Sequence, residues 1–121
     1  MVVLNLFPQE NKLKLVREID AIYLDYDIAM RLAIALNELI CNAIEHGLLQ
    51  SETPELTVSV KRSEQQLELI VRDNGPGFTE QHLQANSING QGLIVKLLHK
   101  VNGTIRYSND QGCVATVHVD L

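Results

Sequence analysis

Two periods in the hydrophobic pattern divide the chain into predicted helices and strands. Apolar residues recur every three or four positions over residues 28–43, which predicts a long amphipathic helix. Asp27 is expected to cap its N-terminus, and Gly47 is expected to end it. Residues 56–61 alternate strictly between apolar and polar side chains, and residues 67–72 follow as a second strand after a polar turn. These two strands predict an antiparallel hairpin.

The remaining segments predict further strands and a second helix. Further strands are predicted at residues 2–7, 12–19, 104–108 and 113–119, and the turn Asn109-Asp110-Gln111-Gly112 joins the last two in a second hairpin. Residues 93–101 predict a second helix, and the polar residues 78–89 before it predict a loop. The expected packing residues of this helix are Leu93, Val95, Leu97, Leu98 and Val101. One sheet with its helices on one face accommodates this order, so we expect an α+β fold: a two-layer α/β sandwich with a mixed, mostly antiparallel sheet.

The composition fits one ordinary globular domain over residues 1–121, which could be excised from a longer protein. With 121 residues and 45% hydrophobic content, the chain can close a single core. Its net charge of −5 argues against a nucleic-acid partner, and no apolar run reaches the roughly 20 residues of a membrane span. Cys41 and Cys113 are too few for a disulfide scaffold. We therefore expect free, buried thiols and a reducing, cytoplasmic location.

Three polar side chains lie four residues apart on the first predicted helix: Glu38, Asn42 and His46. Such a stripe is either a solvated helix face or the lining of a cleft. Its composition favours a cleft, because magnesium takes hard oxygen ligands and one carboxamide oxygen with phosphate oxygens makes a sufficient site. Asn42 is therefore a candidate magnesium ligand. Glu38, one turn away, could orient a water molecule or accept a proton.

The sequence Asp-Asn-Gly-Pro-Gly at residues 73–77 directly follows the predicted strand 67–72. Most strings of this kind are only tight turns. A partly buried carboxylate at the end of an apolar strand, however, needs hydrogen-bond donors, and an adenine amino group could supply one to Asp73. Gly77 would let the backbone approach the ring, where a Cβ atom would collide.

Gly90-Gln91-Gly92 opens the second predicted helix. By itself this motif is weak, and a dinucleotide fingerprint is excluded because the third glycine is missing and no strand precedes it. Free backbone amides at a helix N-terminus nevertheless bind phosphate oxygens.

In this order and spacing, the motifs resemble those of the ATP-binding domains shared by gyrase, heat-shock chaperone ATPases, mismatch-repair ATPases and sensor histidine kinases. Glu38-x-x-x-Asn42-Ala43 resembles the N-box, Asp73-x-Gly75-x-Gly77 the adenine box, and Gly90-x-Gly92-Leu93 the glycine box. The resemblance covers nearly the whole chain. Residues 22–29 and 37–46 are most similar to a branch of sensor histidine kinases with a short lid.

The resemblance implies roles for particular residues. Asp73 would bind the adenine amino group, Asn42 would ligate magnesium, and Glu38 would be the catalytic residue near the γ-phosphate. Residues 78–89 would form the lid, and three helices would cover one face of the sheet. The implied ATP-binding residues are Asn42, His46, Asp73, Gly75, Gly77, Asn89, Gly90, Gln91, Gly92, Leu93 and Cys113.

Three departures from the family pattern bear on function. Cys113 stands where relatives usually have threonine, so one water-mediated contact near adenine could be lost. Residues 78–89 contain no lysine or arginine, so magnesium, His46 and helix amides must meet the phosphate charge. The chain contains no segment that resembles the phosphoacceptor histidine helix.

The resemblance implies the catalytic domain of a sensor histidine kinase. It would bind Mg·ATP and donate the γ-phosphoryl group to a histidine on a separate dimerisation domain, which in turn serves a response regulator. The chain alone should not phosphorylate itself. Two alternatives stay open: a serine kinase of the anti-sigma-factor type, acting on an anti-sigma antagonist, and a non-catalytic module that binds ATP or docks to a partner.

Overall fold

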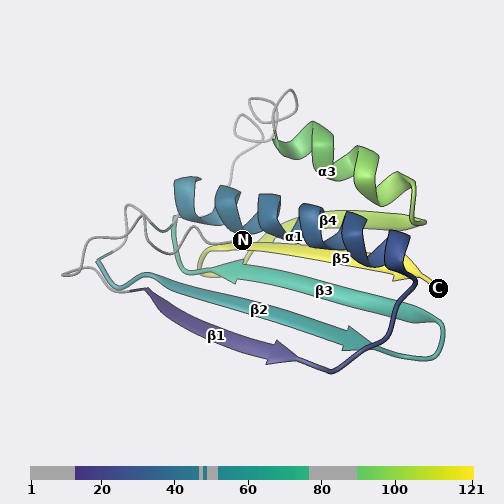
Figure 1. Ribbon diagram of the computed structural model, residues 1–121. Helices are drawn as coiled ribbons and strands as arrows, with labels where there is room; N and C mark the ends of the chain where they lie inside the picture. Colours follow the sequence, from purple (N-terminus) through teal and green to yellow (C-terminus); the bar gives the residue numbers. More distant parts are fainter. Residues whose placement is uncertain (1–12, 47, 49–51, 77–89) are drawn as a thin grey trace.

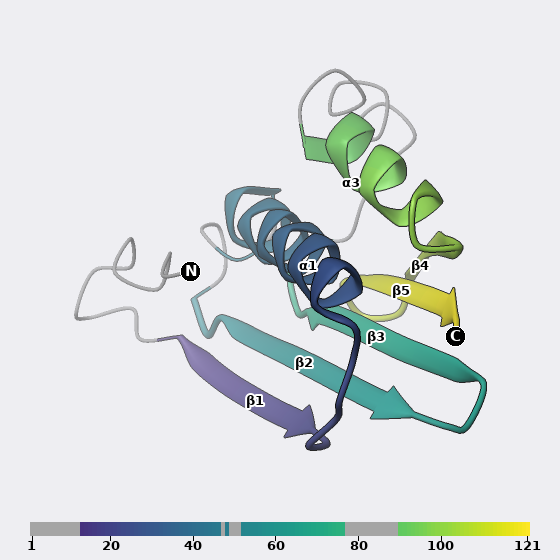
Figure 2. The ribbon, with the colours of Figure 1, turned by 45° about the vertical axis from the view of Figure 1, so that its right-hand side comes forward.

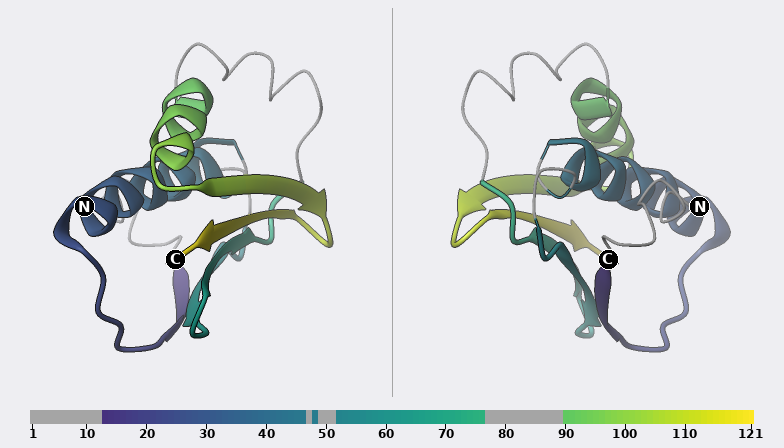
Figure 3. Two further views of the ribbon diagram at one scale, coloured as in Figure 1. Left: turned by 90° about the vertical axis from the view of Figure 1, so that its right-hand side faces the viewer. Right: turned by 90° about the vertical axis from the view of Figure 1, so that its left-hand side faces the viewer.

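A five-stranded sheet forms one layer of the protein and two helices form the other (Figure 1). The computed structural model describes residues 13–46, 48, 52–76 and 90–121. The elements are β1 (Lys14–Ile19), α1 (Tyr26–His46), β2 (Glu55–Arg62), β3 (Gln66–Asp73), α3 (Gly90–His99), β4 (Gly103–Asn109) and β5 (Cys113–Asp120). Both helices lie on the same side of the twisted sheet (Figure 3), which confirms the predicted α+β sandwich.

The sheet is mixed, as expected, with strand order β1-β2-β3-β5-β4. β1 and β2 are parallel because α1 provides the crossover between them. The other three pairs are antiparallel, and β2–β3 and β4–β5 are the two predicted hairpins. The sequence did not indicate that β5 would lie between β3 and β4. That position brings the start of β5 beside the end of β3.

Alternate residues of the strands fill the space under the helices. In β3, Leu67, Leu69, Val71 and Asp73 are buried, whereas the residues between them are more exposed. The α1 residues in this core are Leu32, Ala35, Leu39, Ile40, Ala43 and Ile44. Helix α3 packs beside α1 and above β4 (Figure 2). The core therefore lies between the two layers, and Asp73 is the one charged residue among its buried positions in the described part of the chain.

The first helix begins earlier than its pattern predicted. The N–H of Ala29 donates to the carbonyl of Asp25 at 2.9 Å, which makes Asp25 the capping position. The prediction that Asp27 caps the helix is therefore wrong. Asp27 lies within the first turn, where its carboxylate accepts a 3.4 Å hydrogen bond from Arg31, one turn later.

The expected packing residues of the second helix are confirmed in part: Leu98 and Val101 are buried, and Leu97 packs against the core. Leu93 and Val95 are 40% and 56% exposed, so their predicted packing role is wrong. Ile94 is fully buried instead, together with Leu98 and Val101. The strand expected from residue 12 begins at Lys14. The predicted strand 2–7, the predicted stop at Gly47 and the predicted lid 78–89 fall outside the described residues, and the described residues include no third helix.

Candidate functional site

The two halves of the predicted site lie at the same end of the molecule. Helix α1 lies over the sheet and runs in the same direction as β3, so both elements end on one side (Figures 1 and 2). Asp73 is the last residue of β3, and Asn42 lies in the final turns of α1. Asp73 belongs to the row of β3 residues that face the helices. Asp73 thus faces the helical layer at this end, and Asn42 lies on the last turns of α1 at the same end.

The Asp73 carboxylate is held by two backbone amides. The side chain is only 5% exposed. Its Oδ1 accepts hydrogen bonds from the N–H of Gly75 at 2.9 Å and from the N–H of Cys113 at 3.2 Å. Its Oδ2 accepts none from the described residues. One oxygen therefore orients the group, and the second can accept a hydrogen bond from a ligand.

Close contact between two turns makes this arrangement possible. Gly112 has a φ of 138°, and a Cβ atom at this position would lie 1.9 Å from the carbonyl oxygen of Asp73. Only glycine lets the β4–β5 turn come near enough for the amide of Cys113 to reach the carboxylate. Arg72 donates from its guanidinium to Asp110 at 2.7 Å and ties the same turn to β3.

The thiol of Cys113 lies in the same surroundings. Burial, together with a smaller effect of the nearby Asp73 carboxylate, raises the pKa of Cys113 to about 12. The thiol therefore stays neutral near pH 7. Cys113 is half-buried and free, as is Cys41. The predicted free thiols are confirmed, although neither side chain is fully buried.

On α1, Glu38 and Asn42 are half-buried, one turn apart. The Nδ2 atom of Asn42 is buried and has no hydrogen-bond partner among the described residues. Oδ1 of Asn37 is in the same state. Burial raises the pKa of Cys41, and the negative charges of Glu38 and Glu45 on the same helix raise it to a smaller extent. The helix end therefore combines negative charge with an unsatisfied carboxamide.

For the other predicted site residues, the structure describes the backbone alone, the exposure alone or nothing. Gly90 and Gln91 form the first turn of α3, and only their backbone is described. Gly92 is half-buried and Leu93 is exposed. His46 ends α1 without a described side chain, and Gly77 and Asn89 lie outside the described residues. The amides at the N-terminus of α3 remain candidates for contacting phosphate.

The residues present fit a magnesium ion held mainly by phosphate and water. Within the described ranges, no group of three or more histidine, cysteine, aspartate or glutamate residues could hold a metal ion by itself. Magnesium usually keeps several waters and takes one or two protein ligands beside substrate phosphates. A carboxamide can turn either its oxygen or its nitrogen toward the ligand, so the unpartnered Asn42 position can offer a hard oxygen.

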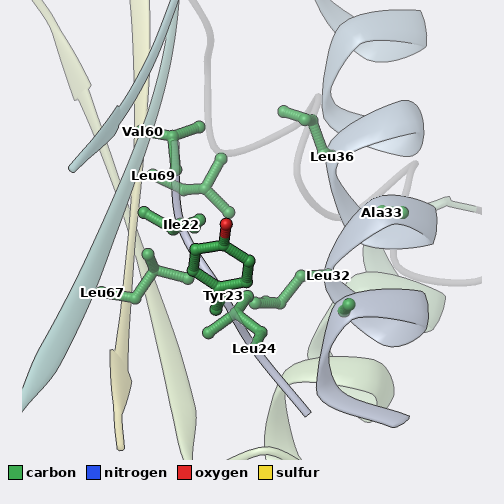
Figure 4. Close-up of a pocket in the computed structure, with 10 residues that line it drawn as sticks. Ile22, Tyr23, Leu24, Leu32, Ala33, Leu36, Val60, Leu67 and Leu69 are labelled. Carbon is green, nitrogen blue, oxygen red and sulfur yellow. The ribbon is translucent and has the colours of Figure 1, made fainter. Parts of the chain in front are cut away.

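A separate apolar cavity of about 380 Å³ lies near the other end of α1. Figure 4 shows side chains from the N-terminal half of α1, from β2 and β3, and from the segment before α1 around this space. Its lining includes Leu32, Leu36, Val60, Leu67 and Leu69. None of the predicted site residues lines this cavity, so the cavity and the candidate site are distinct. No helix in the described ranges is long and apolar enough to cross a membrane.

Sequence reasoning missed two residues that shape the site. Gly112 was expected only as part of a hairpin turn, and Asn74 was expected only as a turn former. The signal for Gly112 was its position in the turn just before Cys113. Asn74 offered no signal beyond the turn motif, because its partners, Thr53 and Glu55, lie about 20 residues earlier at the start of β2.

Comparisons with known proteins agree with this fold. A family described as "Histidine kinase-, DNA gyrase B-, and HSP90-like ATPase" matches residues 27–121, a range that contains every predicted site residue. No curated protein matches the chain significantly.

Several solved histidine kinases share the fold. The histidine kinase domain of a blue-light activated histidine kinase from Erythrobacter litoralis has a TM-score of 0.81 at 18% identity, over 90% of this chain and 52% of that one. The nucleotide-free catalytic domain of histidine kinase ThkA has a TM-score of 0.71 at 19% identity, over 89% and 78%. Acinetobacter baumannii histidine kinase AdeS has a TM-score of 0.69 at 24% identity, over 91% and 55%. This chain thus spans about half the length of the first of these structures.

Proposed function

Because the chain belongs to the family of histidine kinase-, DNA gyrase B- and HSP90-like ATPases, we propose that it binds Mg·ATP and donates the γ-phosphoryl group to a histidine on a separate domain. That acceptor domain would in turn serve a response regulator. One observation supports the proposal: β3, which ends in a buried carboxylate, and the last turns of α1, which carry an unpartnered carboxamide, lie at the same end of the molecule.

Asp73 would recognise the base. Its Oδ1 is occupied by two backbone amides, which leaves Oδ2 to accept a hydrogen bond from the exocyclic amino group of adenine. Because the acceptor is charged and buried, this bond contributes more than an ordinary neutral one. A purine without that amino group cannot make it.

Asn42 would hold the metal ion at the phosphate end, through its carboxamide oxygen. A bound magnesium ion would supply charge neutralisation along the phosphate chain. The amides that begin α3 would meet phosphate oxygens, because helix N-termini favour negative charge. His46, four residues after Asn42 in the sequence, stays a further candidate ATP-binding residue.

Glu38 would act at the acceptor. Phosphoryl transfer depends mainly on positioning and charge neutralisation, and the neutral imidazole of the acceptor is itself a nucleophile. Its nitrogen forms a bond to the γ-phosphorus while the bond to the bridging oxygen of ADP breaks. Glu38 then need only orient the imidazole or accept the proton that it loses.

Replacing Asp73 tests the base assignment. Asp73→Asn presents an amide donor to the amino group in place of one acceptor oxygen. We expect the binding free energy of ATP to fall by about 1–3 kcal/mol, measured by calorimetric titration with magnesium present. Asp20→Asn is the matched control, because Asp20 is exposed and lies beyond the end of β1. An unchanged affinity in Asp73→Asn would refute the assignment.

The transfer step needs a second chain. With γ-labelled ATP, we expect the isolated domain to stay unlabelled and a histidine-bearing dimerisation domain to gain an acid-labile label. An acid-stable label on serine would contradict histidine as the acceptor.

A further inference from the structure

Asn74 joins the turn after Asp73 to the segment that enters β2. Its Oδ1 accepts a hydrogen bond from the backbone N–H of Glu55 at 2.8 Å, and its Nδ2 donates to the carbonyl of Thr53 at 2.8 Å. Its own N–H donates to the carbonyl of Glu55 at 3.2 Å. These bonds extend the β2–β3 ladder beyond its last pair, Leu56 and Asp73. The carboxamide thus serves as an additional peptide group at the end of the sheet.

These bonds restrain Asp73 differently from the amides that hold its carboxylate. Gly75 lies in the turn after β3 and Cys113 is the first residue of β5, and each donates its backbone N–H to the Oδ1 atom. Asn74 instead fixes the backbone beside Asp73 to β2, which lies inside the sheet between β1 and β3. Without this connection, the chain after β3 could shift together with the Gly75 amide. The direction of the Asp73 carboxylate would then no longer be set.

Asn74 itself lies away from the position proposed for the base. Its side chain is exposed and lines a small polar cavity together with Asp73, Thr57 and Arg72. Of these, Thr57 and Arg72 alternate with the buried positions of their strands. This cavity therefore opens on the face of the sheet opposite the helices. Both polar atoms of the Asn74 carboxamide are engaged by the backbone of Thr53 and Glu55, so we expect its effect on a ligand between the layers to act through Asp73.

We propose that Asn74 is a positioning residue for base recognition: it holds the backbone of Asp73 so that the second carboxylate oxygen meets the amino group of the purine. This inference rests on the proposed function of the site. It has a specific consequence, since losing Asn74 should reduce discrimination between purines rather than weaken phosphate binding.

Asn74→Ala removes both side-chain hydrogen bonds. Calorimetric titrations would compare ATP with inosine triphosphate, which lacks the exocyclic amino group. We expect the affinity for ATP to fall about threefold to tenfold while that for inosine triphosphate hardly changes. Gln66→Ala is the matched control, because it removes a polar contact to Asp120 at the opposite end of β3. It should leave the ratio of the ATP affinity to the inosine triphosphate affinity unchanged.

A double-mutant cycle separates positioning from general destabilisation. In an Asp73→Asn background the amino-group contact is already lost, so Asn74→Ala should change the ratio no further. Equal losses for both nucleotides in Asn74→Ala, or a full additional loss in the double variant, would overturn the positioning role. Unchanged ATP affinity in Asp73→Asn alone would overturn the proposed function instead. If the alanine variant does not fold, the same comparison holds for Asn74→Asp, which keeps the acceptor but loses the donor to Thr53.

Discussion

Gly112 is the residue on which the approach of the two turns depends. Its φ of 138° is unfavourable for other residues, and a side chain would collide with the backbone of Asp73. We expect Gly112→Ala to lower the free energy of unfolding by at least about 1 kcal/mol and to weaken ATP binding, because the amide of Cys113 must withdraw from the carboxylate. Denaturant unfolding and nucleotide titration would measure the two effects.

Gly103→Ala is the control for this substitution. Its Cβ atom would meet Leu98 at 3.2 Å, at the far end of β4 from the Asp73 turn. It should cost some stability and leave ATP affinity unchanged. Equal ATP affinity in the Gly112 variant and the original protein would contradict the proposed role of the turn.

The titration of Cys113 links the stability of the protein to pH. Its pKa is raised from the ordinary thiol value of 9.0 to about 12. A raised pKa in the folded state means that the stability linked to this proton is fully present below about pH 9 and is lost as the pH rises toward 12. Near neutral pH the thiol therefore places no second negative charge beside Asp73.

Asp73 shows which part of the site could be predicted from the sequence and which could not. The position of Asp73 at the end of a buried strand followed from the pattern. The donors that hold it did not, because Cys113 lies 40 residues further along the chain. The adenine and magnesium roles of Asp73 and Asn42 remain predictions that the experiments above test.

Among the elements, α3 shows why periodicity alone can fail. Leu93, Ile94 and Val95 are consecutive apolar residues, so they point in three directions around a helix and do not define a single face. Contact with α1 selects Ile94. We expect Ile94→Ala to lower the free energy of unfolding by about 2–4 kcal/mol, because it removes a fully buried side chain.

Val95→Ala is the matched control on the same helix. Val95 is more than half exposed, so its truncation should change stability by no more than about 0.5 kcal/mol. Urea unfolding of both variants would compare them directly. Equal losses would show that the assigned buried face of α3 is wrong.

The positions of the strands along the chain were easier to predict than their order in the sheet. Alternation located β2, β3, β4 and β5, because half-buried strands have a period of two. The strand order depended on contacts between distant segments, and alternation does not encode those. Only the hairpins, whose strands are joined by short turns, could be paired from the sequence.

Over the whole molecule, the proposed ligand would bridge the sheet and the helical layer. Magnesium with ATP should therefore raise the unfolding temperature more than ATP with a chelator. At a ligand concentration 100 times the dissociation constant, binding stabilises a folded protein by about 2.7 kcal/mol. We expect Asn42→Ala to remove the magnesium-dependent part of the shift, measured by thermal unfolding. An equal loss with chelator present would contradict a metal-binding role for Asn42.

The late position of β5 in the chain has a consequence for the order of assembly. Asp73 obtains its second amide only after the C-terminal strand has joined β3. A chain that has formed the β2–β3 hairpin but not yet added β5 would offer an incompletely oriented carboxylate. Nucleotide should therefore bind the native state but not the folding transition state. It should slow unfolding while leaving the folding rate unchanged.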